Sequence, residues 1–238
     1  MGATTKIEWT DSTWNWCYCC SKVSPGCDNC YAERWAKRAG KPWGRPIIAS
    51  QRTFESPLRW KGPCRIFPCS LSDSFHADIP YTWRAYAWDI IARTPQHRYL
   101  MLTRRPENIP DRLPPDWAQN FGHVWLGVTV ENADYLHRIE TLINAARASR
   151  FLSLEPLLGP LPKLDLRWID WVIVGGETGP GARPMEADWA RKVRDECQAA
   201  GVSFFMKQLS RRQPIPADLQ IREIPKGLEL DHASPNST

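Results

Sequence analysis

The sequence predicts an α/β protein in which six or seven strand-then-helix units form a parallel, TIM-like barrel, either partial or complete. Six short apolar runs begin at residues 65, 98, 123, 150, 171 and 202, close to the ~30-residue repeat of a β-α-β unit. The runs are nearly continuous in apolar residues, as expected of parallel strands that are buried on both faces. Apolar residues recur at a helical period between them. A doubly wound open sheet is the alternative, because spacing alone does not separate these two folds.

The predicted strands are bounded by turn signals and lie in this order along the chain: 65–71, 98–103, 123–129, 150–154, 171–175 and 202–206. A helix is expected to begin before the first of them, at the capping residues Asp28 or Asn29, and to end at Gly40. The inner face of this helix would carry Ala32, Trp35, Ala36 and Ala39.

Three further helices are predicted from stripes of apolar residues with a period of 3.6. The stripes are Trp83, Ala87, Ile90 and Ile91; Leu136, Ile139, Leu142, Ile143 and Ala146; and Trp189, Val193, Cys197 and Ala200. The last stripe stops at Gly201, a residue typical of helix C-termini. Six of the 13 tryptophans lie in predicted elements and are core candidates, namely Trp35, Trp83, Trp88, Trp125, Trp171 and Trp189.

The chain is expected to form one domain over residues 1–224, followed by a flexible tail over 225–238. Residues 41–62 are rich in Pro, Trp and Arg and are interpreted as an insertion over one rim of the sheet. No apolar run approaches the ~18 residues that a membrane span needs, and the N-terminus lacks the apolar region of a signal peptide. A cytoplasmic protein without a membrane partner is therefore expected.

Polar residues follow every predicted strand, and ligands of parallel α/β proteins bind at these strand ends. The candidates are Arg104, Glu131, Glu155, Glu177 and Lys207. Glu155 and Glu177 directly follow apolar runs, where a charge is costly unless it has a partner. The glycine-rich run that includes Gly175 and Gly176 is equally consistent with a ligand-binding loop and with a flexible turn.

Five of the eight cysteines lie between Cys17 and Cys30, and clustered thiols in a reducing compartment favour metal or cluster binding over disulfides. Two sets of ligands compete. Zinc would take Cys17, Cys20, Cys27 and Cys30. A [4Fe–4S] cluster would take Cys20, Cys27 and Cys30, with Cys30 in the first turn of a helix, and leave its fourth iron open. The spacing alone leaves both open.

The net charge is +5 from 31 Lys and Arg against 26 Asp and Glu, and the sequence pI is 8.8, just below the ~9 typical of nucleic-acid-binding domains. The insertion nevertheless mixes cations with aromatic rings, as single-strand binders do, at Arg45, Arg52, Arg59, Trp60 and Lys61. A solvated loop with Trp60 turned inward is the alternative interpretation.

Several motifs resemble those of the phage-associated three-cysteine-motif family of unknown function. They are Thr-Asp-Ser-Thr-Trp-Asn at 10–15 followed by Cys20, Val-Ser-Pro-Gly-Cys-Asp-Asn-Cys-Tyr-Ala at 23–32, Ser-Asp-Ser-Phe-His at 72–76, Leu-Thr-Arg-Arg-Pro at 102–106, Trp-Leu-Gly-Val-Thr-Val-Glu-Asn at 125–132, Leu-Glu-Pro-Leu-Leu-Gly-Pro at 154–160, Gly-Gly-Glu-Thr-Gly at 175–179 and Phe-Met-Lys-Gln at 205–208. The family is regarded as similar to radical S-adenosylmethionine (SAM) enzymes, including the spore photoproduct lyase group.

This resemblance implies a partial barrel with a [4Fe–4S] cluster on Cys20, Cys27 and Cys30 and with SAM on the open iron. A reductant for the cluster would start reductive cleavage of SAM to methionine and a 5′-deoxyadenosyl radical. Glu177 is expected to bind the SAM amino group and Arg104 its carboxylate. Other expected cofactor-binding residues are Gly175, Gly176, Glu131, Glu155 and Lys207. The substrate is unidentified, and the phage association adds nucleic acid as a candidate.

Two other functions compete with the radical SAM interpretation. Cys17 and Cys19 are spare thiols, and if either bound the fourth iron, SAM could not chelate it and the protein would be an electron carrier or a structural iron–sulfur protein. The remaining alternative is a non-enzymatic phage protein that binds nucleic acid and is stabilised by zinc or by a cluster.

Overall fold

The computed structural model describes residues 5–230, whose core is a seven-stranded parallel sheet. Its strands are β1 (Ser12–Trp14), β4 (Arg65–Pro68), β5 (Arg98–Thr103), β6 (Val124–Thr129), β7 (Ser149–Leu154), β8 (Trp171–Gly175) and β9 (Ser203–Gln208). They lie side by side in the order in which they occur along the chain. A doubly wound sheet reverses its order at a switch point, so the fold is an open, curled half-barrel.

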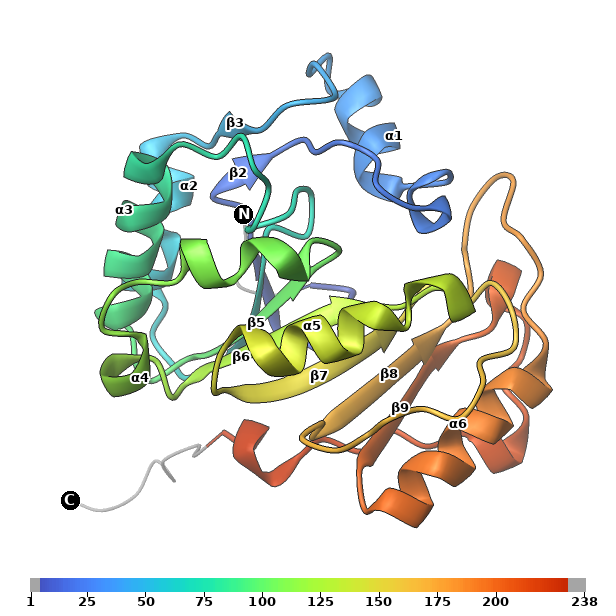
Figure 1. The fold of residues 1–238 in the computed structure, drawn as a ribbon. Coiled ribbons are helices and arrows are strands. Elements are labelled where there is room, and N and C mark those ends of the chain that lie inside the picture. The colour runs from blue at the N-terminus through green and yellow to red at the C-terminus, as the bar shows by residue number, and fades with distance from the viewer. Residues whose placement is uncertain (1–4, 231–238) are drawn as a thin grey trace.

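Six helices accompany the sheet: α1 (Tyr31–Arg38), α2 (Gln51–Phe54), α3 (Tyr81–Ala92), α4 (Trp117–Asn120), α5 (His137–Ala145) and α6 (Ala187–Ala200). Right-handed crossovers that always step in the same direction place their helices on one face of a sheet. Accordingly, α5 and α6 cover the same face (Figure 1). A small antiparallel pair, β2 (Cys17–Tyr18) with β3 (Ile47–Ile48), lies outside the main sheet.

The two faces of the sheet carry two separate apolar clusters. The larger one packs α3, α5 and α6 against one face, with residues such as Ile90, Leu142 and Val193. The smaller one fills the other face, where Trp9 packs against Phe67, Phe151 and Trp171. The segment before β1 therefore closes the concave side of the half-barrel.

The six predicted strands are confirmed, and α3, α5 and α6 lie where the apolar stripes placed them. The α6 helix ends at Gly201, whose φ of +68° is a left-handed cap. β1 was not predicted, because three residues are too few to show a period. No helix in residues 5–230 is long and apolar enough to cross a membrane.

The helix predicted to start at Asp28 or Asn29 and to end at Gly40 instead spans Tyr31–Arg38, and Cys30 precedes its first turn as the N-cap. The Asn29 side chain does not cap it, because its amide donates to Glu177 (2.9 Å) and to the Gly181 carbonyl (3.0 Å). Ala32 and Ala36 form the buried face as expected, whereas Ala39 is exposed because the helix has already ended.

Two predictions about segments outside the barrel need correction. The chain stays packed beyond residue 224: residues 226–228 form a 3₁₀ turn, and Leu228 is fully buried in the concave cluster. Residues 231–238 of the predicted tail lie outside the described residues. The insertion at 41–62 holds β3, α2 and a 3₁₀ turn, and Trp60 packs inward, edge-on to His97.

Candidate functional site

A cavity of about 340 Å³ opens at the carboxyl ends of the strands. Its walls come from the ends of β5 to β9 and from the cysteine-containing loop that leads into α1. Figure 1 shows α1 and this loop beyond the arrowhead ends of the strands. Three of the five clustered thiols line the cavity, those of Cys20, Cys27 and Cys30.

The other two clustered thiols do not line the cavity. The Cys17 Sγ atom lies 3.4 Å from the Cys69 Sγ atom in the larger core cluster, and burial raises the pKa of Cys17 well above its usual value. Cys19 is fully buried with a φ of +66°, and its backbone binds the Leu71 carbonyl (2.9 Å) and the Ser72 hydroxyl (2.5 Å). The spacing of the cysteines did not give this division, but the resemblance did, since it implies Cys20, Cys27 and Cys30 as ligands and leaves Cys17 and Cys19 spare.

Arg105 organises the surroundings of Cys20. Its guanidinium donates to the Cys20 sulfur (3.4 Å), to the Ser21 carbonyl (2.8 Å) and to the Ser21 hydroxyl (2.9 Å). The buried carboxylate of Asp73 pairs with Arg105 (3.0 Å) and also accepts from the Thr103 hydroxyl (2.8 Å). Burial and the Asp73 charge raise the pKa of the Cys20 thiol to about 12, so the free thiol carries its proton at neutral pH.

Glu131, which follows β6, holds the cysteine-containing loop in place. Its carboxylate is fully buried and accepts from Ser24 in the loop (2.6 Å), from Arg104 (2.8 Å) and from Arg138 of α5 (2.9 Å). Gly26 packs so closely that an added Cβ would lie 2.5 Å from the Glu131 side chain. Glu131 does not line the cavity, so it positions the loop rather than facing a ligand.

Glu177 ties the same loop to the end of β8. Its carboxylate pairs with Arg183, which also donates its backbone N–H (2.9 Å), and accepts from Asn29 (2.9 Å). Burial opposes ionisation of Glu177, but these hydrogen bonds outweigh it and lower its pKa. The carboxylate expected to bind a ligand amino group is thus already bound by protein groups.

The remaining predicted site residues lie at the ends of β7, β8 and β9. Lys207 pairs with Glu155 at 2.5 Å, and both line the cavity, so the expectation that Glu155 needs a partner is confirmed. Gly176 lines the cavity, and a Cβ there would collide with the Ser210 backbone, which explains the glycine by packing. Gly175 does not line it and rests against the Glu155 side chain.

The donor set fits an iron–sulfur cluster better than one zinc ion. Zinc holds four ligand atoms at ~2.0–2.3 Å from one point, whereas a cluster binds each thiolate through a different iron. In residues 5–230, no three His, Cys, Asp or Glu side chains converge on one ion. Cys17, which the zinc set requires, faces Cys69 in the core. The three thiols that line the cavity would hold a cluster.

The structure brings the predicted Cys20, Cys27, Cys30, Arg104, Glu155, Gly176, Glu177 and Lys207 to one cavity. Sequence reasoning missed Asp73 and Arg105, although both lie in quoted motifs at strand ends, a signal that could have identified them. It also missed Ser24 and Asn29, whose partners Glu131 and Glu177 are more than 100 residues away in the sequence. It missed Arg183 as well, which binds Glu177 from the irregular loop between β8 and α6.

A family model described as "Protein of unknown function (DUF5131)" matches residues 4–233. No curated protein matches the chain. A solved structure of a spore photoproduct lyase mutant with bound AdoMet and a dinucleoside spore photoproduct is similar, with a TM-score of 0.48 and 12% identity. The match covers 81% of this chain and 62% of that one, and at this identity the likeness extends to the fold alone.

Proposed function

The chain belongs to the DUF5131 family of proteins of unknown function, and we propose that it is an iron–sulfur enzyme of the radical SAM type. One observation carries the proposal: Cys20, Cys27 and Cys30 line a single cavity at the carboxyl ends of a parallel half-barrel, while Cys17 and Cys19 do not. Three protein thiolates leave one iron of a [4Fe–4S] cluster without a protein ligand. SAM would occupy that position.

When bound, a cluster and SAM would supply radical chemistry that begins with reductive cleavage of SAM. The chain's own residues hold and shield the site. Arg105 donates to the Cys20 sulfur, and hydrogen bonds to ligand sulfurs tune reduction potentials. Asp73 fixes the orientation of Arg105, and Glu131 fixes the loop through Ser24.

The expected SAM-binding roles of Glu177 and Arg104 change in this proposal. Glu177 is assigned to positioning, because Arg183 and Asn29 already occupy its carboxylate. Arg104 lines the cavity, but its Nε donates to Glu131 (2.8 Å) and its Nη2 to the Glu155 carbonyl (3.2 Å). Only its remaining N–H groups are free to bind a ligand carboxylate, so Arg104 would hold it less rigidly than a guanidinium that forms a full bidentate pair.

The competing functions have less support. An electron carrier needs a fourth thiolate at the cluster, but the Cys17 sulfur lies beside Cys69 in the core, and neither Cys17 nor Cys19 lines the cavity. A zinc module needs Cys17 in the cavity, and its sulfur lies beside Cys69 instead.

The test is product formation after anaerobic reconstitution with iron and sulfide. With dithionite and SAM, the wild-type protein should release 5′-deoxyadenosine, and a Cys17→Ala/Cys19→Ala variant that still holds iron and sulfide should release it too. Cys197→Ala, a buried thiol on α6, is the control for loss of a cysteine elsewhere. If the double variant holds iron and sulfide but releases no 5′-deoxyadenosine, the proposed enzyme activity is rejected.

A further inference from the structure

Unpaired cations gather at the cavity. Arg104, Arg105 and Lys207 each pair with a carboxylate, but no carboxylate in residues 5–230 forms an ion pair with Lys6, Arg34 or Arg212, which also line it. Lys6 and Arg212 are exposed, and the Arg34 guanidinium donates to the carbonyls of Asn29 and Thr178. Three cations without described counter-charges leave this wall able to bind an anion.

Buried polar atoms without partners gather there as well. Among the described side chains, the indole N–H groups of Trp9 and Trp43 and the hydroxyl of Thr129 are buried and make no hydrogen bond. All three residues line this cavity, and Trp9 and Thr129 are 2% and 0% exposed. A buried donor without an acceptor costs about 1–3 kcal/mol, so a ligand that offers acceptor atoms would relieve that cost.

We infer that the cavity binds a nucleotide unit of a single-stranded nucleic acid. Its phosphate lies against Lys6, Arg34 and Arg212, because cations of this kind bind phosphate oxygens. Its base and sugar offer acceptors to the buried donors, and the half-buried indole ring of Trp43 provides a face on which a base stacks.

The basic insertion that the sequence suggested as the nucleic-acid contact is not this surface. Of residues 41–62, Trp43 lines the cavity, whereas Arg45, Arg52, Arg59, Trp60 and Lys61 do not. Arg59 is directed to the Arg52 carbonyl and to Glu55 instead. That this nucleotide is the reacting substrate rests on the proposed function, but its binding does not.

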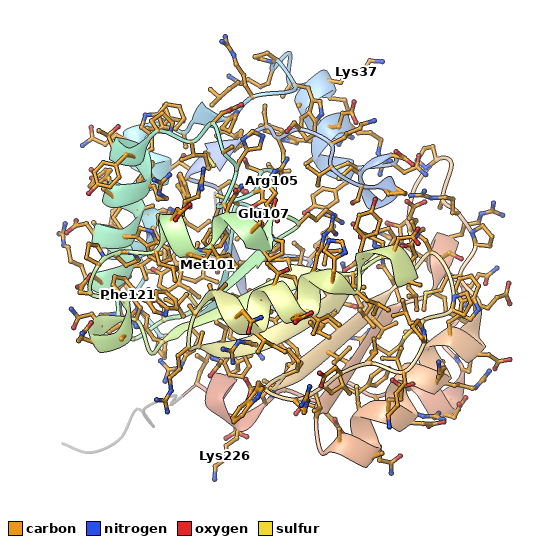
Figure 2. All side chains as sticks on the ribbon, viewed as in Figure 1. Lys37, Met101, Arg105, Glu107, Phe121 and Lys226 are labelled. Atoms are coloured by element: carbon orange, nitrogen blue, oxygen red, sulfur yellow. The ribbon has the colours of Figure 1, made fainter. Side chains whose placement is uncertain are left out.

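Binding is measured as the fluorescence anisotropy of a short labelled single-stranded DNA, at several salt concentrations, on protein with and without a reconstituted cluster. Lys6→Glu and Arg212→Glu each should weaken binding by about tenfold and lower the salt slope by about one. Lys226→Glu makes the same change of charge on a turn that Figure 2 shows at the end of the molecule opposite Lys37 of α1, and it should bind as wild type.

Free mononucleotide and heparin serve as competitors. If a mononucleotide competes as well as the strand does, the ligand of this cavity is a free nucleotide and not a unit of a strand. Equal affinities of all three variants, or heparin that competes as tightly as the strand, would overturn the inference. Selective binding by a protein that takes up no cluster on reconstitution would keep the inference and reject the proposed function. Release of 5′-deoxyadenosine without selective binding would do the reverse.

Discussion

Glu131 is the residue on which the cysteine loop depends. It is fully buried, and its two oxygens serve Ser24, Arg104 and Arg138. Removing one partner of a buried ion pair costs about 3–5 kcal/mol, because a charge is left without compensation. Such a carboxylate tolerates no change of charge.

Glu131→Gln should therefore lower the free energy of unfolding by about 3 kcal/mol, measured by urea denaturation. Glu107→Gln is the matched control, since Glu107 is exposed at the start of a short turn and should change stability by less than ~0.5 kcal/mol. Equal losses in the two variants would show that the buried network does not hold the loop.

At this scale the resemblance singled out the three cysteines that line the cavity, and the apolar runs singled out the strand-end charges, but neither gave their partners. Glu155 and Glu177 were expected to need partners because each follows an apolar run. That Glu131 would bind Ser24 and Glu177 would bind Asn29 depends on contacts across 107 and 148 residues, which no local pattern encodes. The inward position of Cys17 likewise depends on Cys69, which follows β4.

Neighbouring strands of the half-barrel pack tightly where β6 meets β7. Gly127 in β6 faces the ring of Phe151 in β7, and an added Cβ would collide with that ring. Phe151 cannot retreat easily, because it is fully buried against Trp9 and Trp171.

Gly127→Ala should therefore lower the free energy of unfolding by about 1–3 kcal/mol, although alanine normally stabilises a strand relative to glycine. Gly122→Ala just before β6 is the control, since no atom lies near the added Cβ and its φ is ordinary. Thermal unfolding followed by circular dichroism measures both, and a neutral Gly127→Ala would contradict the packing of this face.

Elements were predictable where their pattern was long. The buried strands appeared as apolar runs, and α6 as a stripe that stops at Gly201. β1 has three residues and α1 eight, too few for a clear period, and the start of α1 was misplaced because Asn29 serves Glu177 instead of the helix.

The whole molecule is a singly wound half-barrel, which spacing alone could not distinguish from a doubly wound sheet. Its core holds two histidines near β5, His97 and His123, and burial lowers the pKa of each. The unfolded chain takes up protons at these side chains near pH ~6.5, and the folded chain does so only at lower pH. Stability should therefore be full above this pH and should decline as the pH falls below it.

The melting temperature should accordingly be lower at about pH 5.5 than at about pH 7.5. A His97→Gln/His123→Gln variant should show a flatter dependence, with a remaining slope from His76, whose pKa burial also lowers. An equally steep profile in the variant would show that these two histidines are not the groups that titrate.

The central claim is that one cavity holds an iron–sulfur cluster on three thiols, and its most direct measurement is the iron, sulfide and zinc content of anaerobically prepared cysteine variants. Wild type, Cys17→Ala, Cys19→Ala and Cys197→Ala should each hold about four irons and four sulfides per chain, and Cys20→Ala, Cys27→Ala and Cys30→Ala should lose most of them. A colourless wild-type protein with one zinc and no sulfide would contradict the account.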